Sequence, residues 1–327
     1  MSRSRPLLFI LFLLWISGFC SEVSASPPAV VTVSPFPQTL TADINTSIVI
    51  TFDTPIDPQT VNGTTVSVFG RWSGVATGQY QLENNDTQVR FVPSEPFSAG
   101  EWVTVSISKG VMSQAGQSMS FGFAWNFWIK TEAGTLDLQE IARIPIREPG
   151  EGHIQSYGAY AGDLNEDGYT DLAVPNERSN DVRVFLNDGT GGYGSFTIFP
   201  IPNGDFASTN EGGDLNNDGH IDLAVGNGGG DSVTVYMGDG TGWFSSITNY
   251  QASSNVRGLS VMDLDGDGDV DVVTANRGGN NLSILLNNGN GTFAPRINME
   301  ANGLNETACA VADANGDGIL DLFVGAQ

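Results

Sequence analysis

Four nine-residue stretches decide the fold of this chain, and the third is the most acidic: Asp263-Leu264-Asp265-Gly266-Asp267-Gly268-Asp269-Val270-Asp271. The other three align with it without gaps and occupy residues 163–171, 214–222 and 313–321. Each has Asp at position 1, Asp or Asn at position 3, Asp at position 5, Gly at position 6 and Asp at position 9. Their first residues are 51, 49 and 50 residues apart. The second half of the chain is therefore an internal repeat of about fifty residues.

Oxygen-bearing side chains at this spacing suit calcium, which takes six to eight oxygen ligands at about 2.3–2.6 Å. Positions 1, 3 and 5 can point inward on one tight loop, position 7 offers its carbonyl, and position 9 closes the site. Glycine at position 6 permits the sharp turn. We predict four Ca²⁺ sites, one per repeat. The predicted ligands are Asp163, Asn165, Asp167, Tyr169 and Asp171; Asp214, Asn216, Asp218, His220 and Asp222; Asp263, Asp265, Asp267, Asp269 and Asp271; and Asp313, Asn315, Asp317, Ile319 and Asp321.

The residues after each loop exclude an EF-hand. An EF-hand has a bidentate Glu at position 12, whereas these loops have Val174, Val225, Thr274 and Val324 there. A short apolar stretch typical of a strand follows each loop instead. Because the third loop carries the most liganding Asp residues, we expect it to bind calcium most tightly.

The rest of each repeat predicts an all-β unit. After each of the first three loops come an alternating strand and a Gly-rich hairpin, such as 182–186 followed by 187–191. Phe196, Phe244 and Phe293 then recur and are predicted to anchor the core. A unit of fifty residues with about four strands is typical of a β-propeller blade.

This half, 133–327, closely resembles the FG-GAP/VCBS repeats of integrin-α-like β-propellers, and the resemblance covers roughly residues 140–327. It implies Ca²⁺ held at inter-strand loops on one face of a ring. Such propellers typically close with seven blades, whereas this stretch holds about four repeats, of which the last is truncated. We expect the chain to be a fragment of a longer protein; closure by self-association is the alternative. An open propeller would expose strand edges.

Residues 27–132 are predicted to form a β-sandwich. Short alternating strands at 47–52, 65–69, 88–92 and 102–107 are separated by turn clusters. The stretches 50–57, 91–97 and 100–105 resemble the bacterial Ig-like (SbsA-type) family, which implies a spacer or an adhesive module. The Trp and Phe residues here fit either a sugar site or core packing, and core packing is favoured.

Residues 1–25 are predicted to be a secretory signal peptide. Arg3 and Arg5 precede the apolar run 7–16, and Val23-Ser24-Ala25 has the small-residue pattern of a cleavage site. We therefore expect an exported protein, located in the extracellular space, at the cell surface or in the periplasm, and no transmembrane segment elsewhere in the chain. Removal of the signal peptide would leave Cys309 as the one cysteine, which we expect to be a buried structural thiol.

The charge of the chain argues against a nucleic-acid partner. The net charge is −24, with 37 acidic and 13 basic residues, which leaves few cations for the basic face that phosphate binding needs. From residue 133 on there are 28 acidic residues, and the four loops hold 15 of them, so the charge reflects metal sites rather than partners.

The predicted function is a secreted or cell-surface calcium-binding protein for adhesion or ligand binding, with an extracellular protein or glycan as partner. We predict no enzymatic activity: His153 and His220 are the two histidines, and the sequence has no nucleophile elbow, phosphate loop or zinc spacing. The alternative is a carbohydrate-binding or polysaccharide-degrading (lyase or hydrolase) propeller protein.

Overall fold

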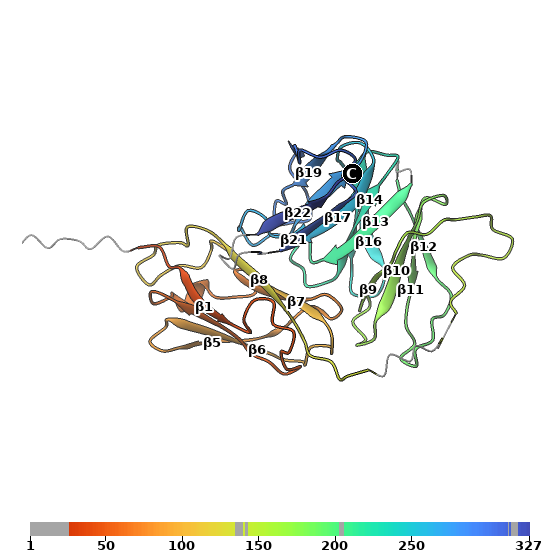
Figure 1. The fold of residues 1–327 in the computed structure, drawn as a ribbon. Coiled ribbons are helices and arrows are strands. Elements are labelled where there is room, and N and C mark those ends of the chain that lie inside the picture. Colours follow the sequence, from red (N-terminus) through yellow and green to blue (C-terminus); the bar gives the residue numbers. More distant parts are fainter. Residues whose placement is uncertain (1–25, 135–139, 141–142, 203–205, 313, 315–319) are drawn as a thin grey trace, which may run out of the picture.

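The structure is a computed structural model that describes residues 26–134, 140, 143–202, 206–312, 314 and 320–327. The predicted signal peptide lies outside these residues. The described part consists of strands and one short 3-10 turn, η1 (Pro58–Thr60), and the predicted all-β fold class is confirmed. Figure 1 shows two groups of strands, the N-terminal group in red to yellow and the C-terminal group in green to blue.

The N-terminal group is a sandwich of two four-stranded antiparallel sheets. One sheet has the order β1-β2-β6-β5 and the other β4-β3-β7-β8. Alternate residues point inward, so that Ile48, Ile50 and Phe52 are buried while the residues between them are half-exposed. The strands are β1 (Val30–Ser34), β2 (Ile48–Phe52), β3 (Val66–Gly70), β4 (Gly74–Val75), β5 (Gly78–Glu83), β6 (Gln88–Pro93), β7 (Trp102–Ile107) and β8 (Phe123–Trp128).

The C-terminal group consists of blades. Three four-stranded antiparallel sheets, β9 to β12, β13 to β16 and β17 to β20, each have their strands in chain order, and β21 pairs with β22 in a fourth, two-stranded sheet. The first strands of successive sheets contact one another and form the inner edge of the array. The strands are β9 (Tyr160–Gly162), β10 (Asp171–Asn176), β11 (Asp181–Phe185), β12 (Thr197–Pro200), β13 (Ala207–Gly213), β14 (Asp222–Asn227), β15 (Ser232–Gly238), β16 (Phe244–Gln251), β17 (Val256–Met262), β18 (Asp271–Asn276), β19 (Asn281–Leu285), β20 (Ile297–Met299), β21 (Ala308–Ala312) and β22 (Asp321–Gly325).

The two middle strands of each complete blade are the most deeply buried. All six residues of β14 and all six of β18 are buried, because other strands of the same blade flank them and neighbouring blades cover their faces. Of the three predicted Phe anchors, Phe244 and Phe293 are buried in the two cores between blades. Phe196 is half-buried and lies under the guanidinium of Arg183, with 4.8 Å between the guanidinium carbon and the ring centroid.

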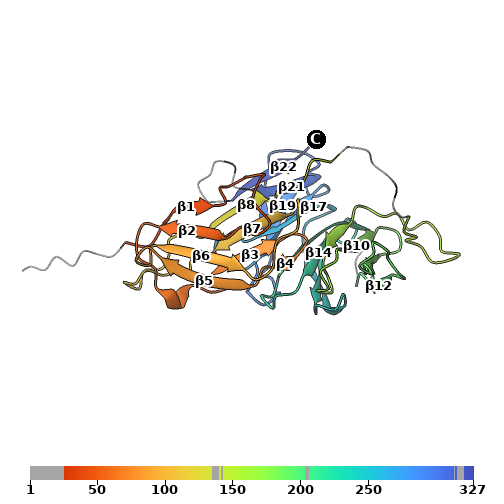
Figure 2. The same cartoon turned by 90° about the horizontal axis from the view of Figure 1, so that it is seen from below.

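The sandwich packs against the inner edge of the blades with its β4-β3-β7-β8 sheet, which Figure 2 shows on the side nearer to the blades. Arg71, directly after β3, makes an ion pair of 2.6 Å with Glu211 of β13. Its backbone carbonyl accepts a hydrogen bond of 2.8 Å from the hydroxyl of Tyr160 on β9. These contacts join two regions that the sequence analysis treated as separate.

No helix among the described residues is long and apolar enough to cross a membrane. Cys309 lies on β21, partly exposed, and burial raises the pKa of its thiol to about 11. At neutral pH this thiol is protonated and a weak nucleophile.

Candidate metal centres

The predicted calcium loops connect the first and second strands of each blade. Loop 1 (163–171) joins β9 to β10, loop 2 (214–222) joins β13 to β14, loop 3 (263–271) joins β17 to β18, and loop 4 (313–321) joins β21 to β22. Because the connections of the three complete blades are equivalent, loops 1, 2 and 3 lie at the same end of the inner strands. That end faces the sandwich.

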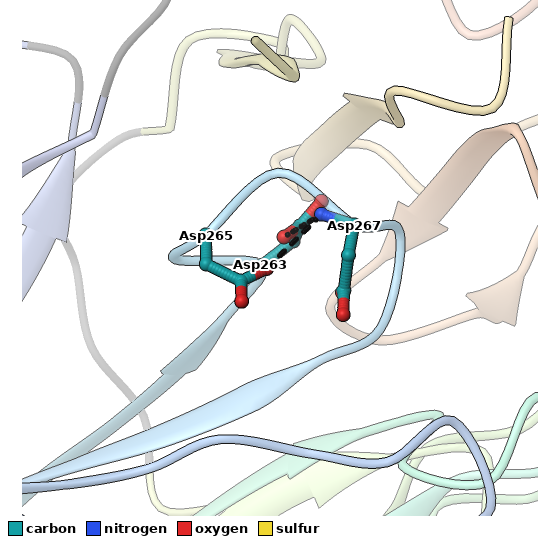
Figure 3. A group of neighbouring side chains, drawn as sticks. All are labelled: Asp263, Asp265 and Asp267. Atoms are coloured by element: carbon teal, nitrogen blue, oxygen red, sulfur yellow. Dashed lines mark hydrogen bonds between the residues drawn. The ribbon is translucent and has the colours of Figure 1, made fainter.

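Loop 3 brings three predicted ligands together. One carboxylate oxygen from each of Asp263, Asp265 and Asp267 lies within 4.8 Å of the other two, and Figure 3 shows the three side chains on one turn. Asp263 is 6% exposed, whereas Asp265 and Asp267 are open to solvent. Hard oxygen donors from positions 1, 3 and 5 that converge in this way suit a divalent cation such as Ca²⁺.

The Asp at position 1 also shapes each loop. The Oδ2 atom of Asp263 accepts a hydrogen bond of 3.0 Å from the backbone N–H of Gly268, and Asp163 and Asp214 bond Gly168 and Gly219 in the same way. The Gly at position 6 has a positive φ, between 87° and 101° in the three described loops. A side chain is disfavoured in that conformation, which explains why this position is always Gly.

The Asp at position 9 joins each loop to the hairpin of the same blade. In loop 2, Oδ2 of Asp222 accepts a hydrogen bond of 2.8 Å from the N–H of Leu215, and Oδ1 accepts one of 2.7 Å from the N–H of Gly238. Asp171 and Asp271 make the equivalent pair of bonds in blades 1 and 3. All three side chains are at most 1% exposed. The sequence analysis predicted position 9 as a ligand only, and the structure gives it this second role.

Several loop carboxyls are protonated more readily than usual. Burial, with neighbouring carboxylates as a lesser cause, raises the pKa of Asp222 and Asp271 to about 7. The same causes raise the pKa of Asp171 and Asp263 to about 6. When ionised, these carboxylates are negative charges at buried positions where water solvates them poorly. A bound divalent cation would offset that cost, so the donor set fits calcium.

Neighbouring loops touch through positions 4 and 7. Glu166 of loop 1 pairs with the ring of His220 in loop 2, and Asn217 of loop 2 donates a hydrogen bond of 2.7 Å to Asp269 of loop 3. The side chain of His220 is 33% exposed and is held by Glu166, whose hydrogen bond also raises the pKa of the ring. Tyr169, at the same position of loop 1, is 49% exposed. Sequence spacing within one repeat carries no signal for such contacts between repeats.

Loop 4 is described in part. Asp321 accepts a hydrogen bond of 3.0 Å from the N–H of Ala314, the same bond between positions 9 and 2 that the other loops make. The other predicted ligands of loop 4 lie outside the described residues: Asp313, Asn315, Asp317 and Ile319.

Loops 1 and 3 also contact the sandwich. Lys109 donates from its backbone N–H to the carbonyl of Gly266, at 3.0 Å, and from its Nζ to the carbonyl of Asp265, at 2.9 Å. Gly122 approaches Gly266 so closely that a Cβ on Gly122 would lie 2.4 Å from the Gly266 Cα. On loop 1, the N–H of Asp163 donates 2.8 Å to the carbonyl of Trp72. Two predicted metal loops are thereby fixed to the other half of the protein.

Comparison with known families agrees with this division of the chain. The model of an FG-GAP-like repeat matches residues 163–225, 214–274 and 263–324, and the model of a bacterial Ig-like domain matches residues 24–128. No curated protein matches the chain.

Solved structures with similar arrangements share little sequence with this chain. A lectin from Agrocybe aegerita, described as recognising non-reducing terminal N-acetylglucosamine, has 16% identity, a TM-score of 0.40 and coverage of 91% of this chain and 74% of that one. The Tc holotoxin pore of Photorhabdus luminescens has 17% identity, a TM-score of 0.35 and coverage of 85% and 14%. The N-terminal part of the bacterial S-layer protein SbsC has 15% identity, a TM-score of 0.26 and coverage of 70% and 45%. TM-scores below 0.5 do not establish a common fold over the whole chain.

Proposed function

From the premise that this chain is an FG-GAP-like repeat protein with an N-terminal bacterial Ig-like domain, we propose that it is an exported calcium-binding module for adhesion or ligand binding. Calcium would be held by the residues at positions 1, 3, 5, 7 and 9 of each loop, four sites in all. We propose no catalytic step for it. Its partner would be an extracellular protein or a glycan.

The convergence of three Asp carboxylates on loop 3 is the observation that carries this proposal. Within one short turn, loop 3 holds acidic residues at all the odd positions, and Lys109 Nζ is hydrogen-bonded to a backbone carbonyl of the loop rather than to its carboxylates. Without a cation these carboxylates repel one another. With Ca²⁺ bound they would hold the turn rigid, and loop 3 would in turn hold the sandwich through its contact with Lys109.

Isothermal titration of the metal-free full chain with Ca²⁺ tests the proposal. We expect saturable binding, and we expect the triple variant Asp263→Asn, Asp265→Asn, Asp267→Asn to lose the tightest class of sites. A matched control replaces three acids of the sandwich that lie outside the loops: Asp43→Asn, Asp53→Asn and Asp86→Asn. The control has the same change of net charge and should bind as the parent does. Equal loss in both variants, or no saturable binding in the parent, would contradict the proposal.

A further inference from the structure

A cavity of about 490 Å³ lies between the sandwich and the blades. One wall is the outward face of β3 and β7, and the opposite wall is formed by the inner strands β13, β17 and β21. Ligand pockets usually enclose about 300–1,000 Å³ and often lie between domains. The volume and the location of this cavity are therefore those of a small-molecule site.

The sandwich wall carries hydroxyl groups that have no protein partner. Ser67 lies directly opposite Ser106 in the β3–β7 pairing, and Phe69 lies opposite Thr104. The three hydroxyls make no hydrogen bond to any other described residue, although each side chain is half-buried and lines the cavity. Their oxygens are not fully buried, so they are accessible to a molecule in the cavity. Water or a polar ligand in the cavity would supply the missing bonds.

An aromatic platform stands at the end of the same wall. Trp102 lines the cavity and stacks on Trp128 of β8, with ring centroids 5.2 Å apart and an angle of 23° between the planes. The indole N–H of Trp102 is buried and has no partner among the described residues. A rigid, flat apolar surface beside free hydroxyls suits a ring with one apolar face and a polar edge.

The opposite wall is mainly apolar. Leu259 and Val261 of β17 and Val311 of β21 contribute aliphatic side chains. A ligand in this cavity would thus meet hydroxyls on one side and, on the other, an aliphatic patch bordered by polar residues of loops 2 and 3. Such a lining suits a guest that has both an apolar face and polar groups.

The charges around the cavity exclude an anion. Arg71 is the one basic residue among the described residues that line it, and its guanidinium is already paired with Glu211 at 2.6 Å. The carboxylates of Asp214, Asp218 and Asp263 also border the cavity. Loop 2 has three acidic residues and loop 3 has five, so one Ca²⁺ in each still leaves net charges of −1 and −3. The local field is therefore negative with calcium bound as well, and it disfavours a phosphate or carboxylate.

From these observations we infer that the cavity binds an uncharged polyol with one apolar face, the chemistry of a neutral sugar of one or two rings. This inference rests on the proposed ligand-binding function and names its ligand class. The contacts of loops 1 and 3 with Trp72 and Lys109 hold the two walls at their present separation. The site is accordingly formed when both loops are ordered.

The test is a titration of the full chain in Ca²⁺ with methyl glucoside, methyl galactoside, methyl mannoside, maltose and cellobiose, monitored by saturation-transfer NMR. Glucuronate and glucose 6-phosphate are the anionic comparison. We expect at least one neutral sugar to bind and both anions to bind at least tenfold more weakly. Thr104→Val removes a hydroxyl without a change of shape and should weaken binding about three- to tenfold. Trp102→Ala should weaken it at least tenfold.

Matched controls are Thr248→Val on the exposed outer strand β16 and Trp243→Ala, which is 54% exposed on blade 2. Neither residue lines the cavity, so both should leave sugar binding unchanged. Absence of binding to every neutral sugar, equal binding of the anions, or binding that Thr104→Val and Trp102→Ala leave intact would overturn the inference. Calcium titration of the same samples separates the two ideas, because a protein that binds calcium but no sugar refutes the cavity alone.

Discussion

The sandwich and the blades are both built from antiparallel sheets around apolar cores, but they differ in how many polar groups they bury. The sandwich has a core of 19 buried apolar residues, whereas four buried polar or charged side chains are found in it among the described residues. The described part of the repeats contains 18 such side chains. They include an Asp and an Asn at equivalent positions of each complete blade, Asp171 and Asn176 in the first.

This difference matters because buried polar groups stabilise a fold only when they are satisfied. In blade 1, buried Arg183 forms ion pairs of 3.0 Å with Asp181 and 2.5 Å with Glu151. Its positive charge is thus balanced by side chains of the protein itself. Among the described residues, none of the predicted ligand carboxylates of the loops forms an ion pair with a Lys or Arg side chain. Apolar burial stabilises the sandwich in any buffer. We infer that the blades reach their full stability when bound calcium balances the negative charge of the loop carboxylates.

Removal of calcium should have the largest effect, because it should destabilise the blades and leave the sandwich unchanged. At a free calcium concentration about 100 times Kd, each site adds about 2.7 kcal/mol to the free energy of unfolding, so the three sites of the complete blades alone add about 8 kcal/mol. Excess EDTA should therefore lower the melting temperature of the blades by about 15 °C or more. Differential scanning calorimetry with and without EDTA measures this. The sandwich should keep its transition, and an unchanged profile would refute the metal-stabilised blade.

Loss of the Asp at position 9 should have the next largest effect. Asp222→Ala leaves the N–H groups of Leu215 and Gly238 without their acceptors in a buried place. Each unsatisfied group costs about 1–3 kcal/mol, so we expect a loss of about 2–6 kcal/mol for the two. Urea unfolding in EDTA isolates this structural role from metal binding. Asp218→Ala in the same loop is the control and should cost much less in EDTA. Equal losses would show that position 9 acts as a ligand alone.

The sequence predicted what recurs within a repeat. The period, the strand after each loop and the Gly at position 6 follow from local backbone geometry, and the structure agrees. Asn176, Asn227 and Asn276 also recur at one position of the repeat, and each hydrogen-bonds the following strand. Their recurrence in the sequence could have indicated this structural role. Of the Trp residues expected in the sandwich core, Trp125 is buried there, whereas Trp102 lines the interdomain cavity. The alternating strand pattern cannot distinguish a solvent face from a face covered by another domain.

Contacts between distant segments could not be predicted in the same way. Lys109 and Gly266 are far apart in the sequence, and their hydrogen bond depends on how two independently patterned regions pack. The same holds for Glu166 and His220, which meet because adjacent blades bring their loops together. These contacts depend on tertiary geometry, for which one sequence has no periodic signature.

The effect of pH on stability should be smaller than the effects of calcium removal and of Asp222→Ala. Its sign should differ between the calcium-free and the calcium-bound protein. In the metal-free protein, the pKa of Asp222 and Asp271 is about 7, above the value of an unfolded Asp. Their stabilisation is therefore full below the unfolded pKa and is lost as the pH rises toward 7. The melting temperature in EDTA should be a few degrees higher at pH 5 than at pH 8. In excess calcium it should be lower at pH 5, because protons compete with the metal.

The pH test needs one control, because His220 titrates in the same range. Glu166 raises the pKa of its ring, and this also favours the folded state at low pH. The variant His220→Gln should keep the opposite slopes in EDTA and in calcium. If the slopes had the same sign in both buffers, the buried loop carboxylates would not be calcium ligands.

The smallest effect should come from a substitution in the sandwich core. Its cost in stability should be the same with and without calcium, unlike the changes in the blades. Ile50 is 0% exposed, and Ile50→Val removes one methylene, which costs about 0.5–1.5 kcal/mol. Because Ile50 lies on β2, in the sheet farther from the blades, we expect the same loss of stability with Ca²⁺ and with EDTA. Urea unfolding of the parent and the variant in both buffers completes a thermodynamic cycle. A coupling energy above about 0.5 kcal/mol would mean that the contacts of Lys109 and Trp72 transmit the state of the loops into the apolar core, so that sandwich and blades unfold as one unit.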